Sequence, residues 1–298
     1  MPEPITYFDR YSKSIRQEKI YGDAALRWVY ETTPGKLALA TVVKRAWFSR
    51  WYGWKMSRPK TRDRIAPFID EYELDSNEFL RPIDEFEHFN AFFSRELTKE
   101  SRPIDSSPDR VVFPADGRHL CIPDLSRSQG LFVKGEQFDT AKLIGDEKLA
   151  ARFADGSLLL SRLCPVDYHR FHFPASGTPT ATRSINGPLY SVNPIALKQN
   201  IQILATNKRT ITTLQTDRVG DVLLIEVGAT CVGSIRQTYE SGIPVQKGEE
   251  KGYFRFGGSS TITIFRQGVI QFDGDLVQQS SNHIELYAKM GDSMATVL

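Results

Sequence analysis

The sequence predicts an α+β protein, with a helical N-terminal region over residues 1–90 and a mostly β region over residues 91–298. Residues 21–72 contain few turn signals, as expected of consecutive helices. From about residue 92 onward, short alternating apolar segments are separated by Gly, Pro, Asp and Asn. This spacing is typical of a β domain rather than of alternating strand–helix units.

The composition is that of a globular protein with a substantial core. Of its 298 residues, 40% are hydrophobic and 25% are charged, and the net charge is +2. So small a charge does not indicate nucleic acid as a partner. The cysteines, Cys121, Cys164 and Cys231, are widely spaced and follow no CxxC pattern, so neither a disulfide framework nor a structural zinc site is expected. A reducing compartment is favoured.

The N-terminal segment is expected to be retained and not to span a membrane. Residues 1–23 mix acidic and basic side chains and contain no apolar core of signal-peptide length. The longest early apolar run, Leu37–Val43, is far shorter than the roughly 20 residues that a membrane-spanning helix needs.

A basic, tryptophan-rich segment stands out in this nearly neutral chain. Residues 43–64 contain eight Lys or Arg residues and one acid, Asp63. At about 100° per residue, Trp47, Trp51 and Trp54 share one face of a helix. Two interpretations are open: a helix lying in the membrane interface, where Trp and basic residues are favourable, or a core helix whose tryptophans pack inward.

The β region is expected to contain several strands and one helix. In chain order, strands are expected at residues 111–117, 157–163, 221–235, 259–265 and 268–276, and a helix at residues 138–155. The sequence GGSS, residues 257–260, interrupts what otherwise looks like two strands near the end of the chain. By itself, this stretch is interpreted as a hairpin turn, because glycine and serine satisfy turn geometry at little steric cost.

Six motifs in a fixed order change that interpretation. They are FFSRELTKESRPID (residues 92–105), FPADG (113–117), PVDYHRFHFP (165–174), LYSVNP (189–194), VGATCVGSI (227–235) and GGSS (257–260). In this order the chain resembles the phosphatidylserine decarboxylase family, pyruvoyl-dependent enzymes made as proenzymes that cut themselves. The resemblance extends over residues 21–290.

The resemblance implies a cut between Gly258 and Ser259. The family branch with the closest pattern carries GGST, so Ser260 stands where threonine is usual, and the hydroxyl is kept. Cleavage would give chains 1–258 and 259–298, which stay together as a heterodimer, and would convert Ser259 into a covalent pyruvoyl group.

The residues also make chemical sense for self-cleavage. A hydroxyl nucleophile must follow an unhindered carbonyl, as Ser259 follows Gly258. The candidate base is His172 and the candidate orienting carboxylate is Asp116. The resemblance supports this triad, and it associates His169 with the decarboxylation step, in which a proton returns to the α carbon.

The implied reaction converts phosphatidylserine into phosphatidylethanolamine. The pyruvoyl ketone would accept the amine of the serine headgroup and take up the electrons left by departing carbon dioxide. The enzyme is expected to lie peripherally on the cytoplasmic face of the cell membrane, with Trp47, Trp51 and Trp54 touching lipid. A homodimer is expected from the family.

Several alternatives are weighed against this interpretation. His169 and His172 could bind a metal, but no further ligands follow at usable spacing, so no metal is expected. Asp116 could be a simple turn residue. Arg95 and Arg102 could each pair with carboxylates or with phosphate. Two other functions are a serine hydrolase acting on lipid esters in an intact chain, and an inactive membrane-binding module.

Overall fold

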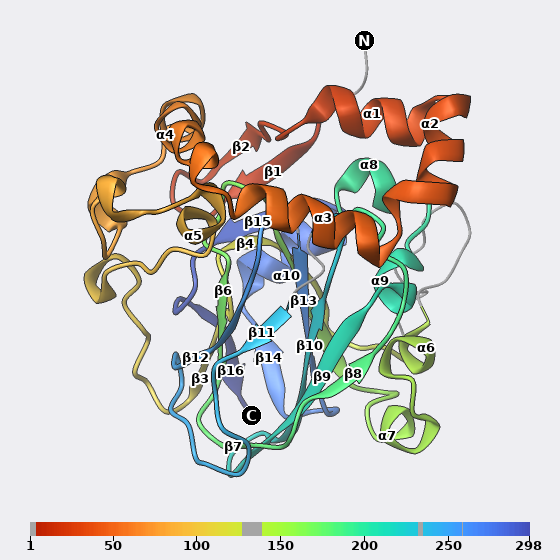
Figure 1. Ribbon diagram of the computed structural model, residues 1–298. Coiled ribbons are helices and arrows are strands. Elements are labelled where there is room, and N and C mark those ends of the chain that lie inside the picture. The colour runs from red at the N-terminus through yellow and green to blue at the C-terminus, as the bar shows by residue number, and fades with distance from the viewer. Residues whose placement is uncertain (1–3, 127–138, 232–234, 258) are drawn as a thin grey trace.

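A large mixed sheet forms the centre of the molecule in the computed structural model, which describes residues 4–126, 139–231, 235–257 and 259–298 (Figure 1). The strand order is β2-β1-β15-β4-β5-β13-β10-β9-β7, and β8 also pairs with β9. These strands are β1 (Thr6–Asp9), β2 (Ser14–Gln17), β4 (Gly117–Ile122), β5 (Ser157–Leu163), β7 (Thr178–Pro179), β8 (Arg183–Ile185), β9 (Arg209–Thr216), β10 (Gly220–Val227), β13 (Ser259–Phe265) and β15 (Glu285–Ala288). Only β1 and β15 pair in parallel, while the other described pairs in this sheet are antiparallel.

Two three-stranded sheets flank the central sheet. One has the order β11-β12-β6 and the other β14-β16-β3. Their strands are β11 (Ile235–Gln237), β12 (Glu250–Phe254), β6 (Arg170–His172), β14 (Ile270–Phe272), β16 (Ser293–Val297) and β3 (Arg110–Val112). The first of these sheets carries His172.

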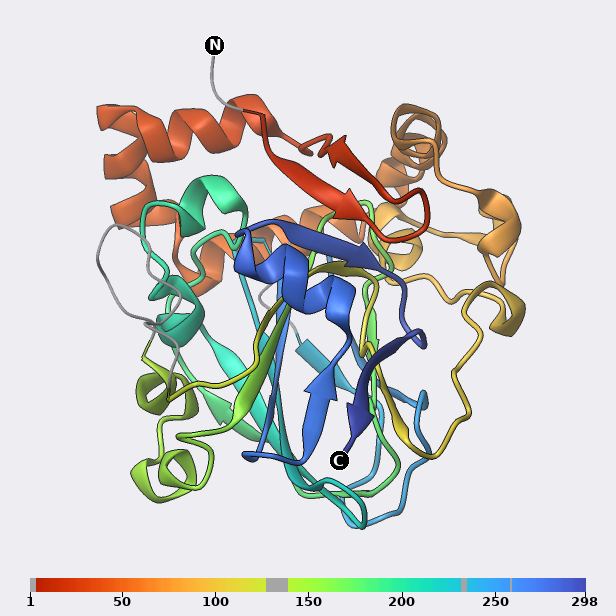
Figure 2. The ribbon, with the colours of Figure 1, turned by 180° about the vertical axis from the view of Figure 1, so that it is seen from behind.

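Short helices surround the sheets. They are α1 (Asp23–Glu31), α2 (Thr33–Ala38), α3 (Ala46–Met56), α4 (Ile65–Tyr72), α5 (Phe89–Phe93), α6 (Thr140–Ile144), α7 (Glu147–Ala151), α8 (Pro194–Leu197), α9 (Ile203–Thr206) and α10 (Gly274–Ser281). A π-helical turn (Leu39–Val43) follows α2, and 3₁₀ turns occur at Pro59–Arg64, Ser76–Glu78, Ile83–Glu85 and Lys99–Ser101. Side-chain caps begin several helices; for example, Asp146 accepts a hydrogen bond from Leu149 N at the start of α7. Both views place α1–α3 and the β1–β2 hairpin at one end of the molecule (Figures 1 and 2).

The core has separate apolar clusters on the two sides of the central sheet. Ile262 and Ile264 of β13 pack in one cluster, with residues of α6, α8 and α9. Leu159 of β5 and Leu224 of β10 belong to the other. A third cluster is aromatic and includes residues of α4, α5 and Phe256, so the N-terminal helices pack directly against the segment that precedes Ser259.

The mixed α+β class is confirmed, and the strands expected at residues 157–163 and 259–265 are β5 and β13. The helix expected at residues 138–155 is divided into α6 and α7, because Gly145 ends α6 with a φ of 60°. Residue 138 itself lies outside the described residues.

Four expectations differ from the structure. The strand expected at residues 111–117 ends at Val112 as β3, and the strand expected at residues 268–276 is only β14, because α10 begins at Gly274. The strand expected at residues 221–235 ends at Val227, and residues 232–234 lie outside the described part of the chain. The first 90 residues are not all helical, since β1 and β2 extend the central sheet through pairing with β15. Within the described ranges, no helix is long and apolar enough to cross a bilayer.

Candidate active site

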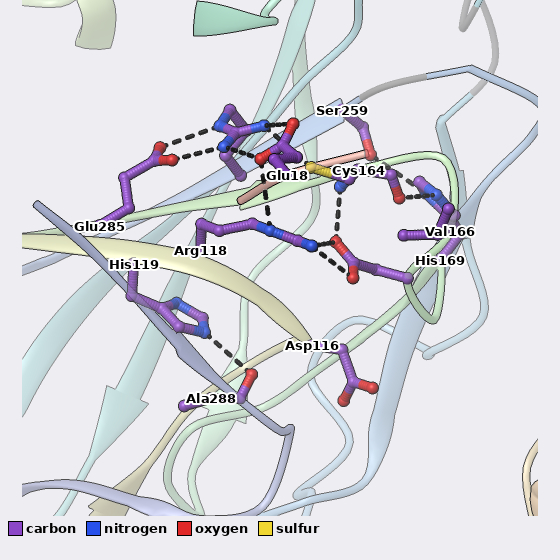
Figure 3. A network of polar contacts seen from close by, with 12 residues as sticks. Glu18, Asp116, Arg118, His119, Cys164, Val166, His169, Ser259, Glu285 and Ala288 are labelled. Carbon is purple, nitrogen blue, oxygen red and sulfur yellow. Dashed lines mark hydrogen bonds and ion pairs between the residues drawn. The ribbon is translucent and has the colours of Figure 1, made fainter. Parts of the chain in front are cut away.

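Ser259 is the first residue of β13 and is fully buried. Its backbone pairs with Leu163 of β5, and the next residue, Ser260, pairs with Val227 of β10. The Oγ atom of Ser259 lies 3.4 Å from Nδ1 of His169, at the long end of hydrogen-bond distances (Figure 3). The strand thus presents one hydroxyl to one imidazole in a site closed to water. Gly258, the other half of the expected cut site, lies outside the described residues.

His169 is held in one orientation and one tautomer. Its Nε2 lies 2.9 Å from the carbonyl oxygen of Cys164, which can only accept, so Nε2 carries the hydrogen of the neutral ring. Nδ1 therefore faces Ser259 as a proton acceptor. Phe93 stacks on the ring with a centroid distance of 3.9 Å. Burial and the nearby charge of Arg95 lower the pKa of His169 to about 3, so the ring is neutral at physiological pH.

The loop that carries His169 is anchored by a buried ion pair. Asp167 accepts a hydrogen bond of 2.6 Å from Cys164 N and also binds Arg118 at 2.5 Å through its other carboxylate oxygen. The Cys164 residue is consequently held at both ends, by Asp167 at its amide and by His169 at its carbonyl. The same peptide segment also positions His169. Asp167 and Arg118 therefore determine where Nδ1 of His169 lies.

A second layer of buried charges supports this loop (Figure 3). Arg162 of β5 donates to Glu18 at 2.7 Å and to Glu285 of β15, and Arg118 lies 3.4 Å from Glu18. Burial would raise the pKa of Glu18, but the charges of Arg162 and Arg118 together lower it to about 2. Cys164 Sγ also contacts Arg162 at 2.9 Å. The N-terminal segment thus supplies a carboxylate to the inside of the site.

Asp116 follows β3 in the FPADG motif and is fully engaged by other groups. Arg102 donates to its carboxylate from Nε and, at 2.6 Å, from Nη2, and Met290 N donates at 2.8 Å. Arg102 also binds Glu78 at 3.0 Å. Of the two arginines that the sequence left undecided, Arg102 therefore pairs with carboxylates. Arg95 is buried, and its Nε and Nη1 have no hydrogen-bond partner among the described residues.

His172 ends β6 and lies beside a small cavity. Its backbone amide donates to Pro114 O at 2.7 Å, and Tyr168 stacks on its ring. The cavity, about 10 Å³, is also bordered by Lys251 and Thr261. Nδ1 of His172 has no hydrogen-bond partner in the described part of the chain, and burial lowers the pKa of this imidazole to about 3.

Among the described residues, Asp116, His172 and Ser259 therefore do not make the contacts with one another that the triad requires. The carboxylate of Asp116 is bound by Arg102 instead of His172. The imidazole next to Ser259 is His169. The physical reason is local: His169 precedes β6 and is bent back onto Cys164, whereas His172 lies in the strand and is fixed by its backbone pairing.

A cavity of about 530 Å³ reaches the serine end of the site. Its wall is largely apolar and includes Leu26, Val29, Phe48, Tyr52 and Phe256. Polar residues of the buried network, together with the segment before Ser259, close its inner end; these are Glu18, Arg162, Cys164 and Gly257. Such a shape suits a ligand with one small reactive polar group and a long apolar part.

The tryptophans of α3 lie at the surface. Trp47, Trp51 and Trp54 are 54%, 47% and 56% exposed, so the core-helix interpretation is wrong. Leu37, in α2, is 67% exposed at the same end of the molecule. These exposed apolar side chains of α2 and α3 are together called the tryptophan face.

Within the described ranges, no cluster of three or more His, Cys, Asp or Glu side chains could hold a metal ion. Sequence reasoning missed Glu18, Arg118 and Arg162. No local signal could have found them, because each contact joins segments far apart in the chain, as for Arg162 and Glu18, which are 144 residues apart.

Comparisons with known proteins identify close relatives. The family model described as phosphatidylserine decarboxylase matches residues 89–296. A phosphatidylserine decarboxylase proenzyme from Fusobacterium nucleatum is 42% identical over 290 residues, which cover 97% of each chain. The proenzyme of the same name from Clostridium beijerinckii is 41% identical over 98% of this chain and 99% of the relative. That from Chlamydia caviae is 42% identical over 99% of this chain and 98% of the relative.

Proposed function

Because this chain belongs to the phosphatidylserine decarboxylase family, we propose that Ser259, His169 and His172 carry out its maturation and its reaction. The protein is a proenzyme that matures by self-cleavage and then converts phosphatidylserine into phosphatidylethanolamine with release of carbon dioxide. The observation that carries the residue assignment is the buried contact of 3.4 Å between Ser259 Oγ and His169 Nδ1.

Self-cleavage occurs between Gly258 and Ser259 in this proposal. The hydroxyl of Ser259 attacks the preceding carbonyl, and the peptide C–N bond breaks as the ester forms. Elimination across the Cα–Cβ bond of residue 259 then releases the carboxylate of chain 1–258, and hydrolysis of the dehydroalanine that is left by one water gives the ketone and ammonia. Ser259 thereby becomes the pyruvoyl group, which supplies an electron sink for the electrons left when carbon dioxide departs. The site fits this group, because Ser259 is buried against the ring of His169, and the cavity of about 530 Å³ is lined by Gly257 and by Leu163, the backbone partner of Ser259.

His169 serves the decarboxylation step. Its neutral ring faces the position of Ser259, and the hydrogen bond to Cys164 O keeps Nε2 protonated and Nδ1 available. Nδ1 can take up the proton that the ammonium group of the substrate loses and pass it to the carbon atom that carbon dioxide leaves, and no other described histidine contacts Ser259. Phe93, stacked on the ring, keeps water from the same position.

His172 and Asp116 serve self-cleavage. The unpartnered Nδ1 of His172 can accept a proton. The amide of His172 donates to Pro114 O, and Asp116, two residues further along the chain, is held by Arg102. The uncut chain must bring His172 closer to Ser259 for this role. A competing assignment makes His169 the base of cleavage as well, because its Nδ1 is the imidazole nitrogen in contact with Ser259 Oγ.

The apolar cavity receives the substrate. Its lining by Leu26, Val29, Phe48 and Tyr52 suits the apolar part of the lipid, and the end near Gly257 places the serine headgroup beside the reactive residue. The tryptophan face at the same end of the molecule lies in the membrane interface and lets substrate enter from the lipid. In this proposal the protein is peripheral, on the cytoplasmic face of the cell membrane.

The experiment that tests this function combines intact mass and activity. Denatured wild-type protein is expected to give chains 1–258 and 259–298, the shorter one with a ketone in place of its terminal amine. Ser259→Ala is expected to stay uncut and inactive. An uncut wild-type chain that is labelled at Ser259 by a phosphonate would instead support a serine hydrolase.

Two histidine variants separate the two assignments. His169→Ala is expected to be cut and to lose decarboxylation, whereas His172→Ala is expected to stay uncut. The reverse pattern would establish His169 as the cleavage base.

Membrane association has its own test. Replacing Trp47, Trp51 and Trp54 together with Ala is expected to weaken sedimentation with lipid vesicles while the protein stays folded and cut. Unchanged binding of the folded variant would contradict the interfacial role of α3.

A further inference from the structure

A second cavity lies beside α3, on the side away from the apolar cavity. Phe48 and Tyr52 of α3 line the apolar cavity. Arg50, Gly53 and Trp54 line the second one, which has a volume of about 320 Å³. At about 100° per residue these two sets occupy opposite sides of the helix. The second cavity therefore borders the tryptophan face through Trp54 and lies across α3 from Phe48 and Tyr52, and the two cavities meet at Cys231, which lines both.

The charge of this second cavity is uncompensated. Its lining contains two arginines, Arg50 and Arg255, and no acidic residue. Both arginines are exposed, and in the described part of the chain neither has a hydrogen bond, an ion pair or a ring contact. By contrast, the nearby Lys55 and Arg58 lie over the rings of Trp51 and Trp54.

The polar side chains in the wall between the two arginines are hydrogen-bonded within the protein. Asn90 Nδ2 donates to Ser57 Oγ at 3.0 Å, and Asn90 Oδ1 accepts from Phe256 N at 3.0 Å. Ser49 Oγ accepts from Cys231 N at 3.1 Å. These hydrogen bonds connect α3, α5 and the segment after β12, so the cavity exists without a ligand and the guanidinium groups are the donors left for one.

We propose that this cavity binds a phosphate group. Two guanidinium groups around a cavity without carboxylates match the charge and the bidentate geometry of phosphate oxygens. The phosphate can belong to the headgroup of a membrane lipid or to free phosphate. The adjacent Trp54 favours the headgroup, because an interfacial tryptophan lies at the depth of lipid phosphates. The site adjoins the catalytic cavity at Cys231 but is lined by other charged residues, and it does not depend on decarboxylation.

The test compares single charge removals on the full-length wild-type background. Arg50→Gln and Arg255→Gln remove one cavity charge each, and Arg58→Gln removes one charge from the same surface but outside the cavity. Binding is measured by sedimentation with vesicles of phosphatidylcholine and phosphatidylglycerol, neither of which is the substrate. A second arm measures stabilisation of each protein by inorganic phosphate in thermal unfolding.

Each cavity variant is expected to bind the anionic vesicles about fivefold more weakly, and Arg58→Gln less than twofold. This outcome assigns the site to a lipid headgroup. Unchanged vesicle binding with loss of phosphate stabilisation in both cavity variants assigns it to free phosphate. Equal weakening by Arg58→Gln would show diffuse surface charge and would overturn the proposal, as would cavity variants that match wild type in both arms. Self-cleavage, monitored by mass, reports separately on the proposed function.

Discussion

Glu18 offers the sharpest test of how the N-terminal segment supports the active site. Its side chain is 2% exposed, and the carboxylate lies between two buried arginines, Arg162 and Arg118. Burial opposes ionisation, and the two arginines outweigh it, so the pKa falls from an ordinary 4.5 to about 2. A difference of this size corresponds to about 3 kcal/mol of stability at neutral pH. Glu18→Gln should remove about that amount.

The pH dependence follows from the sign of the change. The folded-state pKa of Glu18 is depressed, so its contribution is complete above pH 4.5 and is lost as the pH falls towards 2. The stability difference between wild type and Glu18→Gln should therefore be about 3 kcal/mol at pH 6 and should shrink below pH 4.5. At neutral pH the melting temperature should fall by roughly 6 °C.

The assay is urea unfolding of both proteins in the uncut Ser259→Ala background, where the chain stays single and unfolding can be reversed. Glu73→Gln is the matched control, because Glu73 pairs with Lys19 near the same hairpin but its side chain is 81% exposed. This control should unfold like wild type. Equal stability of Glu18→Gln and wild type at pH 6, or a difference that does not change with pH, would refute the reasoning.

Three further predictions follow from the same contacts. Asp167→Asn keeps its size but loses the ion pair with Arg118, so the His169 loop should loosen and kcat should fall at least tenfold while the chain remains folded by circular dichroism. Lys251→Met leaves the buried carboxylate of Glu226 without its cation and should destabilise the protein by about 3–5 kcal/mol in urea unfolding. Borohydride should abolish decarboxylation by reducing the ketone, without changing the two-chain pattern; full activity after reduction would contradict a pyruvoyl group.

Local patterns predicted the parts of the fold that are local in origin. β5 follows from an apolar run, and β13 from the alternation of Thr and Ile after a turn sequence. β1 was missed, because four residues at Thr6–Asp9 become a strand only by pairing with β15, near the other end of the chain. Its partner, and not its own propensity, determines its structure.

In the candidate active site, too, some residues could be predicted from the sequence and others could not. Ser259 and His169 were found through sequence motifs, and the structure brings them together. The partners of Asp116 could not be predicted, since Arg102 and Arg95 look equivalent in sequence and only the tertiary structure places Arg102 against the carboxylate. Glu18 looks like a surface residue until the hairpin turns it inward.

The position of β13 determines the order in which the protein folds and is cut. This strand lies between β5 and β10, and β15 lies between β1 and β4, so residues 259–298 are woven into the structure at several places. The uncut chain must therefore fold first, guided by covalent continuity, and the cut comes afterwards. Once cut, an unfolded molecule would have to recruit a separate short strand into the middle of a sheet, a bimolecular search in place of an intramolecular one. After maturation, a molecule that unfolds does not readily refold, so the lifetime of the working enzyme is set by how slowly it unfolds.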